Sequence, residues 1–145
     1  MKKIAYQKDK ATKKDFENIA KNIAKEIKKG DTILLIGELG TGKTFFTNKL
    51  CKHLNAKNIV NSPSYVLLNE YTTETTKIYH YDLYRLANAE EAMELGIFDR
   101  IKEGITIIEW PEKIKEYLPK NTIEIHIEHA DDSRNIKIKK IGGIK

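Results

Sequence analysis

The 145-residue sequence lacks several features that define common protein classes. Its one cysteine, Cys51, has no internal disulfide partner, and we expect it to be a small packing residue on a helix. No apolar run approaches the roughly 20 residues that a membrane-spanning helix requires. Residues 1–10 are charged and lack the apolar core of a secretion signal. These absences favour a cytoplasmic protein, and the length predicts one domain over residues 1–145.

Acidic residues are scarce at both ends of the chain. Residues 1–30 carry ten lysines and four acids, and residues 134–145 carry five basic residues and no acid. Residues 31–133 are acidic, with 17 acids against 11 basic residues. Basic segments can bind nucleic acid, but lysine-rich segments more often keep a surface solvated, and we favour the solvated surface here.

A complete phosphate-binding motif, G-x-x-x-x-G-K-[ST], occupies residues 37–44. The apolar segment before it, residues 32–36, has the composition of a buried parallel strand. After the motif, apolar residues recur at helical spacing, namely Phe45, Phe46, Leu50 and Leu54. A helix is therefore expected to begin at Thr44. A strand, a glycine-rich loop and a helix N-terminus are the surroundings in which this motif binds nucleoside triphosphates.

Each part of this loop has an expected physical role. The free N–H groups and positive dipole end of the helix attract phosphate. Lys43 supplies a cation for the outer phosphates, and the Thr44 hydroxyl is placed to ligate Mg²⁺. Gly37, Gly40 and Gly42 are expected to let the backbone curl with positive φ and approach the ligand closely. The expected nucleotide contacts in the loop are Glu38, Leu39, Gly40, Thr41, Gly42, Lys43 and Thr44.

Two acids are candidates for the carboxylate that such a loop needs at the end of a neighbouring strand. Glu109 follows the apolar segment 105–108, at the C-terminal end of a second buried strand, where ligands collect in α/β sheets. Asp82 ends a more mixed strand, residues 77–82. Strand position favours Glu109 as the metal ligand. His80, between two tyrosines, is expected to be a packed, hydrogen-bonded residue rather than a base.

Apolar periodicity predicts the remaining elements. They are an edge strand at 4–6, an amphipathic helix ending at Gly30, a hairpin of 66–68 and 77–82 with its turn at 71–76, and short helices near 90–95 and 97–102. Residues 122–128 and 135–141 alternate apolar and polar, which predicts half-exposed antiparallel strands. The predicted fold class is α/β: a single-domain P-loop NTPase with a mixed sheet, a parallel core and antiparallel edge strands, flanked by helices.

Several segments beyond the loop carry a resemblance to one family. They are Asn61-Ser62-Pro63-Ser64-Tyr65, Tyr79-His80-Tyr81-Asp82-Leu83-Tyr84-Arg85-Leu86, Leu95-Gly96-Ile97-Phe98-Asp99, Ile108-Glu109-Trp110-Pro111-Glu112, and residues 131–136. In order and spacing they closely resemble TsaE (earlier YjeE), the small P-loop ATPase of bacterial tRNA threonylcarbamoyladenosine synthesis. The phosphate-binding loop is shared by many enzymes, whereas the His-x-Asp-x-Tyr-Arg and Glu-Trp-Pro segments together are specific.

The resemblance implies an ATPase with bound ATP and Mg²⁺ that does not itself modify tRNA. It implies action on TsaD and TsaB homologues, which the ATPase resets or activates between turnovers, with weak hydrolysis when it is alone. On this resemblance Lys43 and Thr44 hold phosphate and Mg²⁺, Glu109 completes the metal site, and Asp82 is needed for hydrolysis.

The same resemblance suggests residues around the base of the nucleotide. Trp110 is expected beside the site, Thr12 resembles the threonine near the adenine, and Ser133 and Arg134 resemble the C-terminal nucleotide contact. The chain departs from the family in two ways. Thr12 stands further from the loop than usual, and Ser64-Tyr65 replaces the more usual Thr-aromatic pair.

Three other classes share the loop. A GTPase needs a guanine-reading Asn-Lys-x-Asp, and the only Asn-Lys, at residues 48–49, lies inside the helix after the loop. A small-molecule kinase usually closes an arginine-bearing lid, whereas this chain has three arginines, Arg85, Arg100 and Arg134, and no long lid segment in its sequence. A nucleotide-dependent binding module without turnover has the same motifs, and a turnover assay separates it from an ATPase.

Overall fold

The computed structural model describes residues 2–57, 68–119 and 122–141. The elements are β1 (Lys2–Ala11), α1 (Lys13–Glu26), β2 (Thr32–Ile36), α2 (Lys43–His53), β3 (Leu68–Thr72), β4 (Lys77–Asp82), α3 (Ala89–Glu94), α4 (Ile97–Arg100), β5 (Ile105–Glu109), the 3-10 helix η1 (Lys115–Tyr117), β6 (Thr122–Ala130) and β7 (Ser133–Ile141). The Asn61–Tyr65 motif and residues 66–67 of the predicted hairpin lie outside the described residues.

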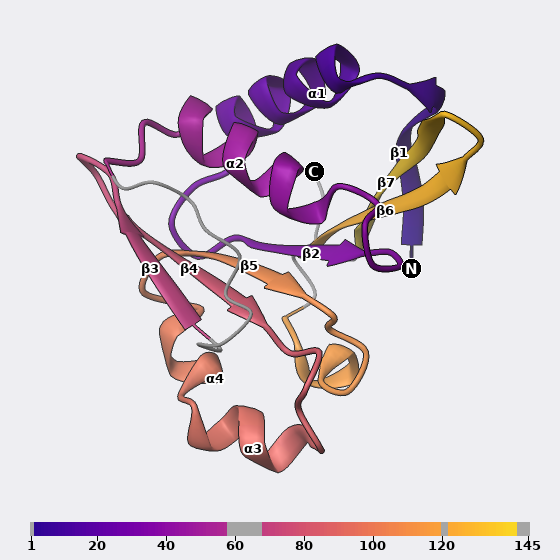
Figure 1. Cartoon of the computed structure of the whole chain (residues 1–145). Helices are drawn as coiled ribbons and strands as arrows, with labels where there is room; N and C mark the ends of the chain where they lie inside the picture. Colours follow the sequence, from indigo (N-terminus) through magenta and orange to yellow (C-terminus); the bar gives the residue numbers. More distant parts are fainter. Residues whose placement is uncertain (1, 58–67, 120–121, 142–145) are drawn as a thin grey trace.

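The described strands form one sheet in the order β1-β7-β6-β2-β5-β4-β3 (Figure 1). At its centre, β2 runs parallel to both β5 and β6, and β4 runs parallel to β5. Toward the edges, β3 pairs antiparallel with β4, and β7 pairs antiparallel with β6 and β1. The predicted fold class, an α/β fold whose mixed sheet has a parallel core and antiparallel edges, is confirmed.

One predicted pairing is right on one side only. Alternation over residues 122–128 predicted antiparallel pairing, and β6 does pair antiparallel with β7, but on its other side it runs parallel to β2 inside the sheet. The alternation instead reflects the two different faces of the sheet. Ile125 and Ile127 are buried on the face that the first helices cover, while His126 and Glu128 are more exposed on the other face. The antiparallel prediction for β7 is confirmed on both of its sides.

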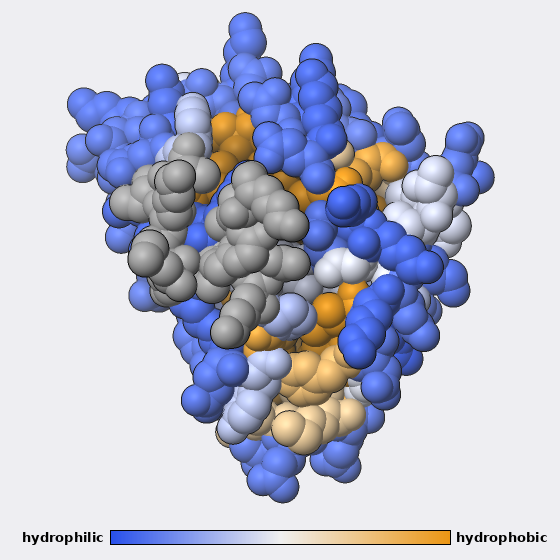
Figure 2. All heavy atoms as spheres, turned by 180° about the vertical axis from the view of Figure 1, so that it is seen from behind, coloured by the Kyte–Doolittle hydropathy of each residue, from blue (hydrophilic) through white to orange (hydrophobic). Residues whose placement is uncertain are grey.

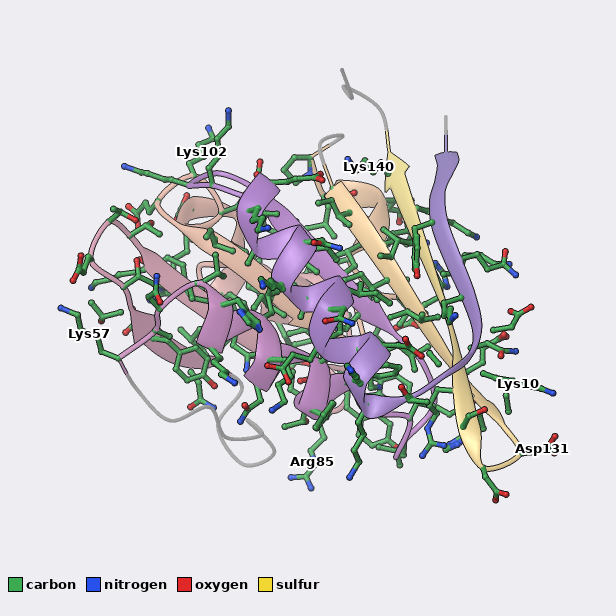
Figure 3. All side chains as sticks on the ribbon, turned by 90° about the horizontal axis from the view of Figure 1, so that it is seen from above. Lys10, Lys57, Arg85, Lys102, Asp131 and Lys140 are labelled. Atoms are coloured by element: carbon green, nitrogen blue, oxygen red, sulfur yellow. The ribbon has the colours of Figure 1, made fainter. Side chains whose placement is uncertain are left out.

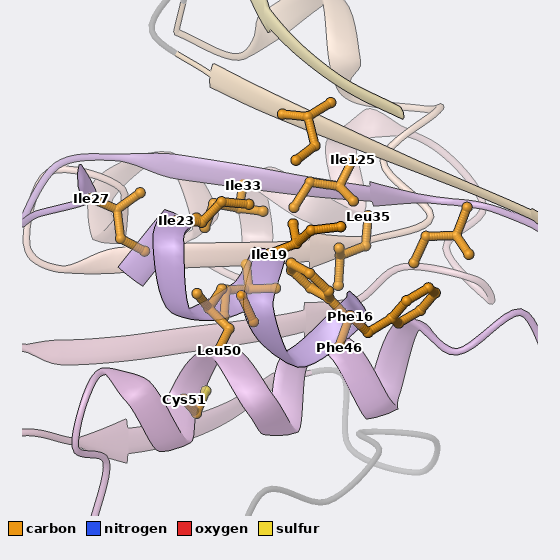
Figure 4. Close-up of a cluster of buried hydrophobic side chains, with 14 of the residues drawn as sticks. Phe16, Ile19, Ile23, Ile27, Ile33, Leu35, Phe46, Leu50, Cys51 and Ile125 are labelled. Carbon is orange, nitrogen blue, oxygen red and sulfur yellow. The ribbon is translucent and has the colours of Figure 1, made fainter. Parts of the chain in front are cut away.

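Helices α1 and α2 cover one face of the sheet, and α3 and α4 cover the other (Figure 1). Helix α1 buries an apolar stripe at helical spacing and turns its lysines outward, as its amphipathic sequence predicts. Figure 4 shows side chains of α1 and α2 packed against those of β2 and β6. The labelled residues of this cluster are Phe16, Ile19, Ile23, Ile27, Ile33, Leu35, Phe46, Leu50, Cys51 and Ile125.

A second apolar cluster lies beneath α3 and α4, where it includes Leu34, Tyr81 and Ile108 from the strands and Ile97 from α4. The alternation of side chains along each strand therefore divides the sheet into two buried faces. Figure 2 shows that, seen from behind, the molecule is largely hydrophilic, with hydrophobic residues at the centre and lower part of this view.

Other element predictions differ from the structure mainly at their ends. The edge strand β1 is longer than residues 4–6, and α1 ends at Glu26 rather than near Gly30. The short helices α3 and α4 are present, separated by Gly96 in a left-handed conformation. Among the residues described, no helix has both the length and the apolar character needed to cross a membrane.

Candidate active site

The phosphate-binding loop connects β2 to α2, and the helix begins at Lys43, one residue before the predicted start. Gly42 precedes the helix with φ 109°, and no described side chain caps this end. The first turn also carries no acidic residue. The amide groups at the start of α2 are therefore left for an anion, and the helix dipole favours one there.

The three glycines of the loop are required for different structural reasons. Gly40 and Gly42 have the predicted positive φ, at 76° and 109°, but Gly37 does not, so that prediction is wrong for Gly37. Gly37 is needed because β6 passes close to it. A Cβ at this position would overlap the Ile127 carbonyl oxygen and lie 2.9 Å from Thr41 Oγ1.

The turn of the β6–β7 hairpin holds the loop from one side. Arg134 donates from Nε to the Thr41 carbonyl at 3.1 Å and from Nη2 to the Gly40 carbonyl at 3.2 Å. His129 Nε2 lies 3.3 Å from the Leu39 carbonyl oxygen. Arg134 therefore supports the loop, while its contact with nucleotide stays a prediction. The contact of His129 had no signal in the sequence, because it depends on how the hairpin folds over the loop.

Lys43 is buried within this arrangement, with 5% of its surface exposed. Its Nζ donates to the Gly37 carbonyl at 2.6 Å and lies 3.6 Å from the centroid of the Trp110 ring. Burial lowers the pKa of Lys43, and this effect is opposed by nearby carboxylates, first Glu109 and then Asp82. The lysine is a cation largely removed from water.

Trp110 lies beside the loop lysine, as the resemblance implied. It is partly buried, and its backbone adopts the left-handed region with φ 59°, which is uncommon for a bulky residue. The Tyr84 ring packs on it with ring centroids 4.8 Å apart. Since Tyr84 is 53% exposed, this aromatic pair extends from the lysine to the surface.

Asp82 and Glu109 lie directly opposite each other where the parallel strands β4 and β5 end. Leu35, near the end of β2, pairs with Glu109 from the other side. The C-terminal ends of three neighbouring strands thus bring both predicted carboxylates to the mouth of the loop. Glu109 is buried and Asp82 is partly buried.

Burial raises the pKa of Asp82, and the charge of Glu109 raises it further. These effects are opposed by the Tyr84 N–H, which donates to Asp82 Oδ1 at 3.0 Å, and by His80 and Lys43. Two close carboxylates in a partly dry site repel each other, which favours a cation between or beside them.

The available donor set suits Mg²⁺. Two carboxylates and the hydroxyl of Thr44, in the first turn of α2, are all oxygen ligands. Within the described ranges, no three His, Cys, Asp or Glu side chains gather as a metal cluster. Mg²⁺ commonly binds through one or two carboxylates together with substrate phosphates and water, so a full protein cage is not required.

His80 is fully buried beside the carboxylates, at 0% exposure. Its Nε2 lies 2.6 Å from Glu109 Oε2, and its Nδ1 lies 3.1 Å from the Tyr71 hydroxyl. The prediction that His80 is packed and hydrogen-bonded is confirmed. The sequence did not indicate that Glu109 and Tyr71 are its partners.

A pocket of about 480 Å³ adjoins the loop on the side away from Glu109's strand. Its lining residues are Ala11, Thr12, Lys13, Phe16, Thr41, Gly42, Phe45, Asp132, Ser133 and Arg134. The volume falls in the range of about 300–1,000 Å³ that is typical of small-molecule sites. The pocket brings Thr12 together with Ser133 and Arg134, which lie far from it in the sequence, beside the loop.

Two details of this pocket were not predicted. The Thr12 hydroxyl already caps α1, since it accepts from the Asp15 N–H at 3.2 Å and donates to the Asp15 carboxylate at 3.1 Å. Phe16 and Phe45, with ring centroids 6.1 Å apart, supply aromatic surface. Helical periodicity predicted Phe16 as a core residue, and it is buried in the first apolar cluster; spacing alone did not indicate that its ring also lines a pocket.

Comparisons with known proteins agree with one another. A family model described as "Threonylcarbamoyl adenosine biosynthesis protein TsaE" matches residues 10–136. The relative from Rickettsia prowazekii, named tRNA threonylcarbamoyladenosine biosynthesis protein TsaE, is 40% identical over 126 residues, which cover 86% of this chain and 88% of the relative. A relative of the same name from Bacillus subtilis is 37% identical, covering 86% and 78%.

A solved structure is also similar over most of the chain. The crystal structure of Bacillus subtilis YdiB matches with a TM-score of 0.77 and 29% sequence identity, covering 98% of this chain and 88% of that one.

Proposed function

Because the chain belongs to the TsaE family, we propose that it is a Mg²⁺-dependent ATPase required for tRNA threonylcarbamoyladenosine modification. One observation carries the ATPase part of the proposal. A buried loop lysine, Lys43, and two paired strand-end carboxylates, Asp82 and Glu109, meet in front of an uncapped helix N-terminus. This arrangement supplies charge of both signs where a triphosphate and its metal would lie.

The loop and Lys43 bind the phosphates in this proposal. The ammonium of Lys43, which now donates to the Gly37 carbonyl, gains a stronger acceptor when phosphate oxygens arrive. Thr44 and Glu109 hold Mg²⁺ through oxygen atoms. When bound, Mg²⁺ neutralises charge on the outer phosphates. The pocket beside the loop takes the adenosine, with Thr12, Ser133 and Arg134 on its walls and Phe16 and Phe45 as apolar surface for the base.

Asp82 orients the attacking water. Its Oδ1 accepts the Tyr84 N–H, which fixes the carboxylate at the end of β4. Asp82 lies opposite Glu109, the proposed Mg²⁺ ligand. It can therefore act beside the metal without binding it directly. A positioned carboxylate of this kind aligns water and accepts its proton.

The proposed partners are TsaD and TsaB homologues, through which the ATPase meets tRNA only indirectly. Two large apolar side chains are exposed next to the site: Leu39 at the tip of the loop, at 63%, and Tyr84 on Trp110, at 53%. Exposed apolar side chains around a catalytic site support a docking role. We propose that hydrolysis is weak until a partner covers this region.

The kinase alternative gains no support from the arginines. Arg134 donates to carbonyls of the loop, and Arg100 donates to the Leu95 carbonyl at 2.6 Å and contacts the Tyr81 hydroxyl. Figure 3 shows Arg85 projecting away from the body of the domain. A binding module without turnover remains the competing reading, and it differs from the ATPase in one measurable respect.

That respect is turnover. Phosphate release should be slow for the chain alone and faster with TsaD and TsaB homologues. Asp82→Asn should bind ATP normally and lose at least about tenfold of the stimulated rate, as expected for a residue that positions or deprotonates water. Wild-type protein that binds ATP but releases no phosphate with these partners would favour the binding module. A fully active Asp82→Asn variant would remove Asp82 from the chemistry.

A further inference from the structure

Three buried residues, Tyr71, His80 and Glu109, form a line of hydrogen bonds that ends on Glu109, the proposed Mg²⁺ ligand. Side chains two residues apart on a strand share a face. His80 therefore shares the face of Asp82 on β4, and Glu109 shares the face of Ile107, which pairs with His80. Tyr71 sits diagonally from His80 on β3, because Asn69 is the residue opposite His80. The line thus crosses three strands, β3, β4 and β5, on the face covered by α1 and α2.

The chemistry of the three groups gives the line a direction. As a carboxylate, Glu109 can only accept, so the 2.6 Å contact requires a proton on His80 Nε2. The other ring nitrogen, Nδ1, lies 3.1 Å from the Tyr71 hydroxyl, which can donate to an unprotonated Nδ1 or accept from a protonated one. Tyr71, His80 and Glu109 are 3%, 0% and 3% exposed, so water does not readily replace these bonds.

We propose that His80 and Tyr71 are positioning residues for Glu109. His80 bonds Oε2 of the carboxylate, so that the other oxygen, Oε1, would be available to a cation, and Tyr71 fixes the orientation of the His80 ring. The proposal rests on the function proposed above, since Glu109 is the Mg²⁺ ligand there. Neither residue touches nucleotide; both act through the orientation of one buried carboxylate, as partners behind metal ligands do elsewhere.

The first test measures the coupling between Mg²⁺ and nucleotide rather than activity. Calorimetry with a non-hydrolysable ATP analogue, with and without Mg²⁺, gives the gain in affinity that the metal provides. His80→Ala should reduce this gain about 10–100-fold, the usual cost of losing a partner behind a ligand. His80→Gln, whose amide can donate to the carboxylate, should recover part of it. Affinity without Mg²⁺ should not change in either variant.

Tyr71→Phe removes one hydroxyl and tests the outer bond. It should reduce the Mg²⁺-dependent gain by less than His80→Ala does. The matched control is Tyr79→Phe, a hydroxyl removed from the opposite face of β4, which should keep the full gain. A purely structural role for the line would lower thermal stability in the variants yet leave the Mg²⁺-dependent gain intact, and that result would overturn the proposal.

The second test needs no ligand. Long-range ¹⁵N–¹H spectra of the wild-type protein should show His80 with its proton on Nε2, and Tyr71→Phe should shift the Nδ1 signal. A ring without a proton on Nε2 would overturn the proposal. These tests separate failure of the proposed function from failure of the positioning role. If the wild-type protein binds no nucleotide, the proposed function is wrong, and the spectrum still tests the positioning role. If it binds nucleotide and His80→Ala keeps the full Mg²⁺-dependent gain in affinity, only the positioning role is wrong.

Discussion

At the scale of single residues, Asp82 combines a cost to folding with a proposed catalytic use. Its pKa is raised above the ordinary value of 3.8 by burial and by Glu109, so the folded protein holds a proton there more tightly than the unfolded chain does. Ionised Asp82 therefore destabilises the fold. This loss begins as pH rises through 3.8 and is complete above the raised pKa, so it is present at neutral pH.

Asp82→Asn should accordingly stabilise the protein, although we expect the same change to lower the stimulated rate. The amide keeps the shape of the carboxylate and can still accept the Tyr84 N–H, but it carries no charge opposite Glu109. We expect a gain of up to about 1 kcal/mol in the free energy of unfolding near neutral pH, typical of relieved strain at an active site. Urea denaturation at about pH 4 and about pH 7 should show the gain growing with pH. A variant less stable than wild type at neutral pH would contradict this.

Cys51 shows the opposite case, a residue that burial makes inert. It packs in the first apolar cluster without exposure, and burial raises the pKa of its thiol to about 12. Because the thiolate is the reactive form, the native protein should resist a thiol reagent at neutral pH and react only after unfolding. Rapid labelling of the native protein, monitored by absorbance, would show that this part of the core opens.

At the scale of elements, the loop depends on how closely β6 passes it. Gly37→Ala places a methyl group against the Ile127 carbonyl, so strand or loop must move. We expect a loss of about 1–3 kcal/mol in unfolding free energy, the range for overpacking, together with weakened nucleotide binding.

Gly40→Ala is the matched control in the same loop. A Cβ there meets nothing within 4 Å, and only the positive φ of 76° opposes it. The cost should be about 1 kcal/mol, since a left-handed conformation is strained for an L-residue. Thermal unfolding of both variants decides the matter: a loss for Gly37→Ala no larger than that for Gly40→Ala would mean that contact with β6 does not set the requirement at residue 37.

Local patterns predicted the loop, the strands before and after it, and the position of Glu109, because these signals lie within short stretches of sequence. The parallel pairing of β6 was not predictable in this way. Alternation reports which residues face the core, but it does not report the direction of a neighbouring strand. The links from Arg134 and His129 to the loop, and from His80 to Glu109, join residues distant in sequence for the same reason.

At the scale of the whole molecule, the sheet separates two kinds of surface. The basic ends of the chain meet at one edge, since β1 pairs with β7 along most of its length. The acidic residues of the site lie at the ends of the central strands. We predicted that these basic segments only keep the surface solvated, and this stays a prediction. Nucleotide and partner are expected at the strand ends, where the loop, the carboxylates and exposed apolar side chains meet.

The central claim is that Lys43 and its surroundings bind Mg²⁺-ATP, and calorimetric titration of ATP with Mg²⁺ tests it most directly. Lys43→Ala removes a buried cation that is proposed to bond phosphate, and hydrogen bonds to charged groups contribute about 1.5–3 kcal/mol, so affinity should fall about 10–100-fold. Lys52→Ala, on the exposed last turn of the same helix and paired with Glu17 at 3.1 Å, should bind as the wild type does. Wild-type affinity in the Lys43→Ala variant would contradict the account.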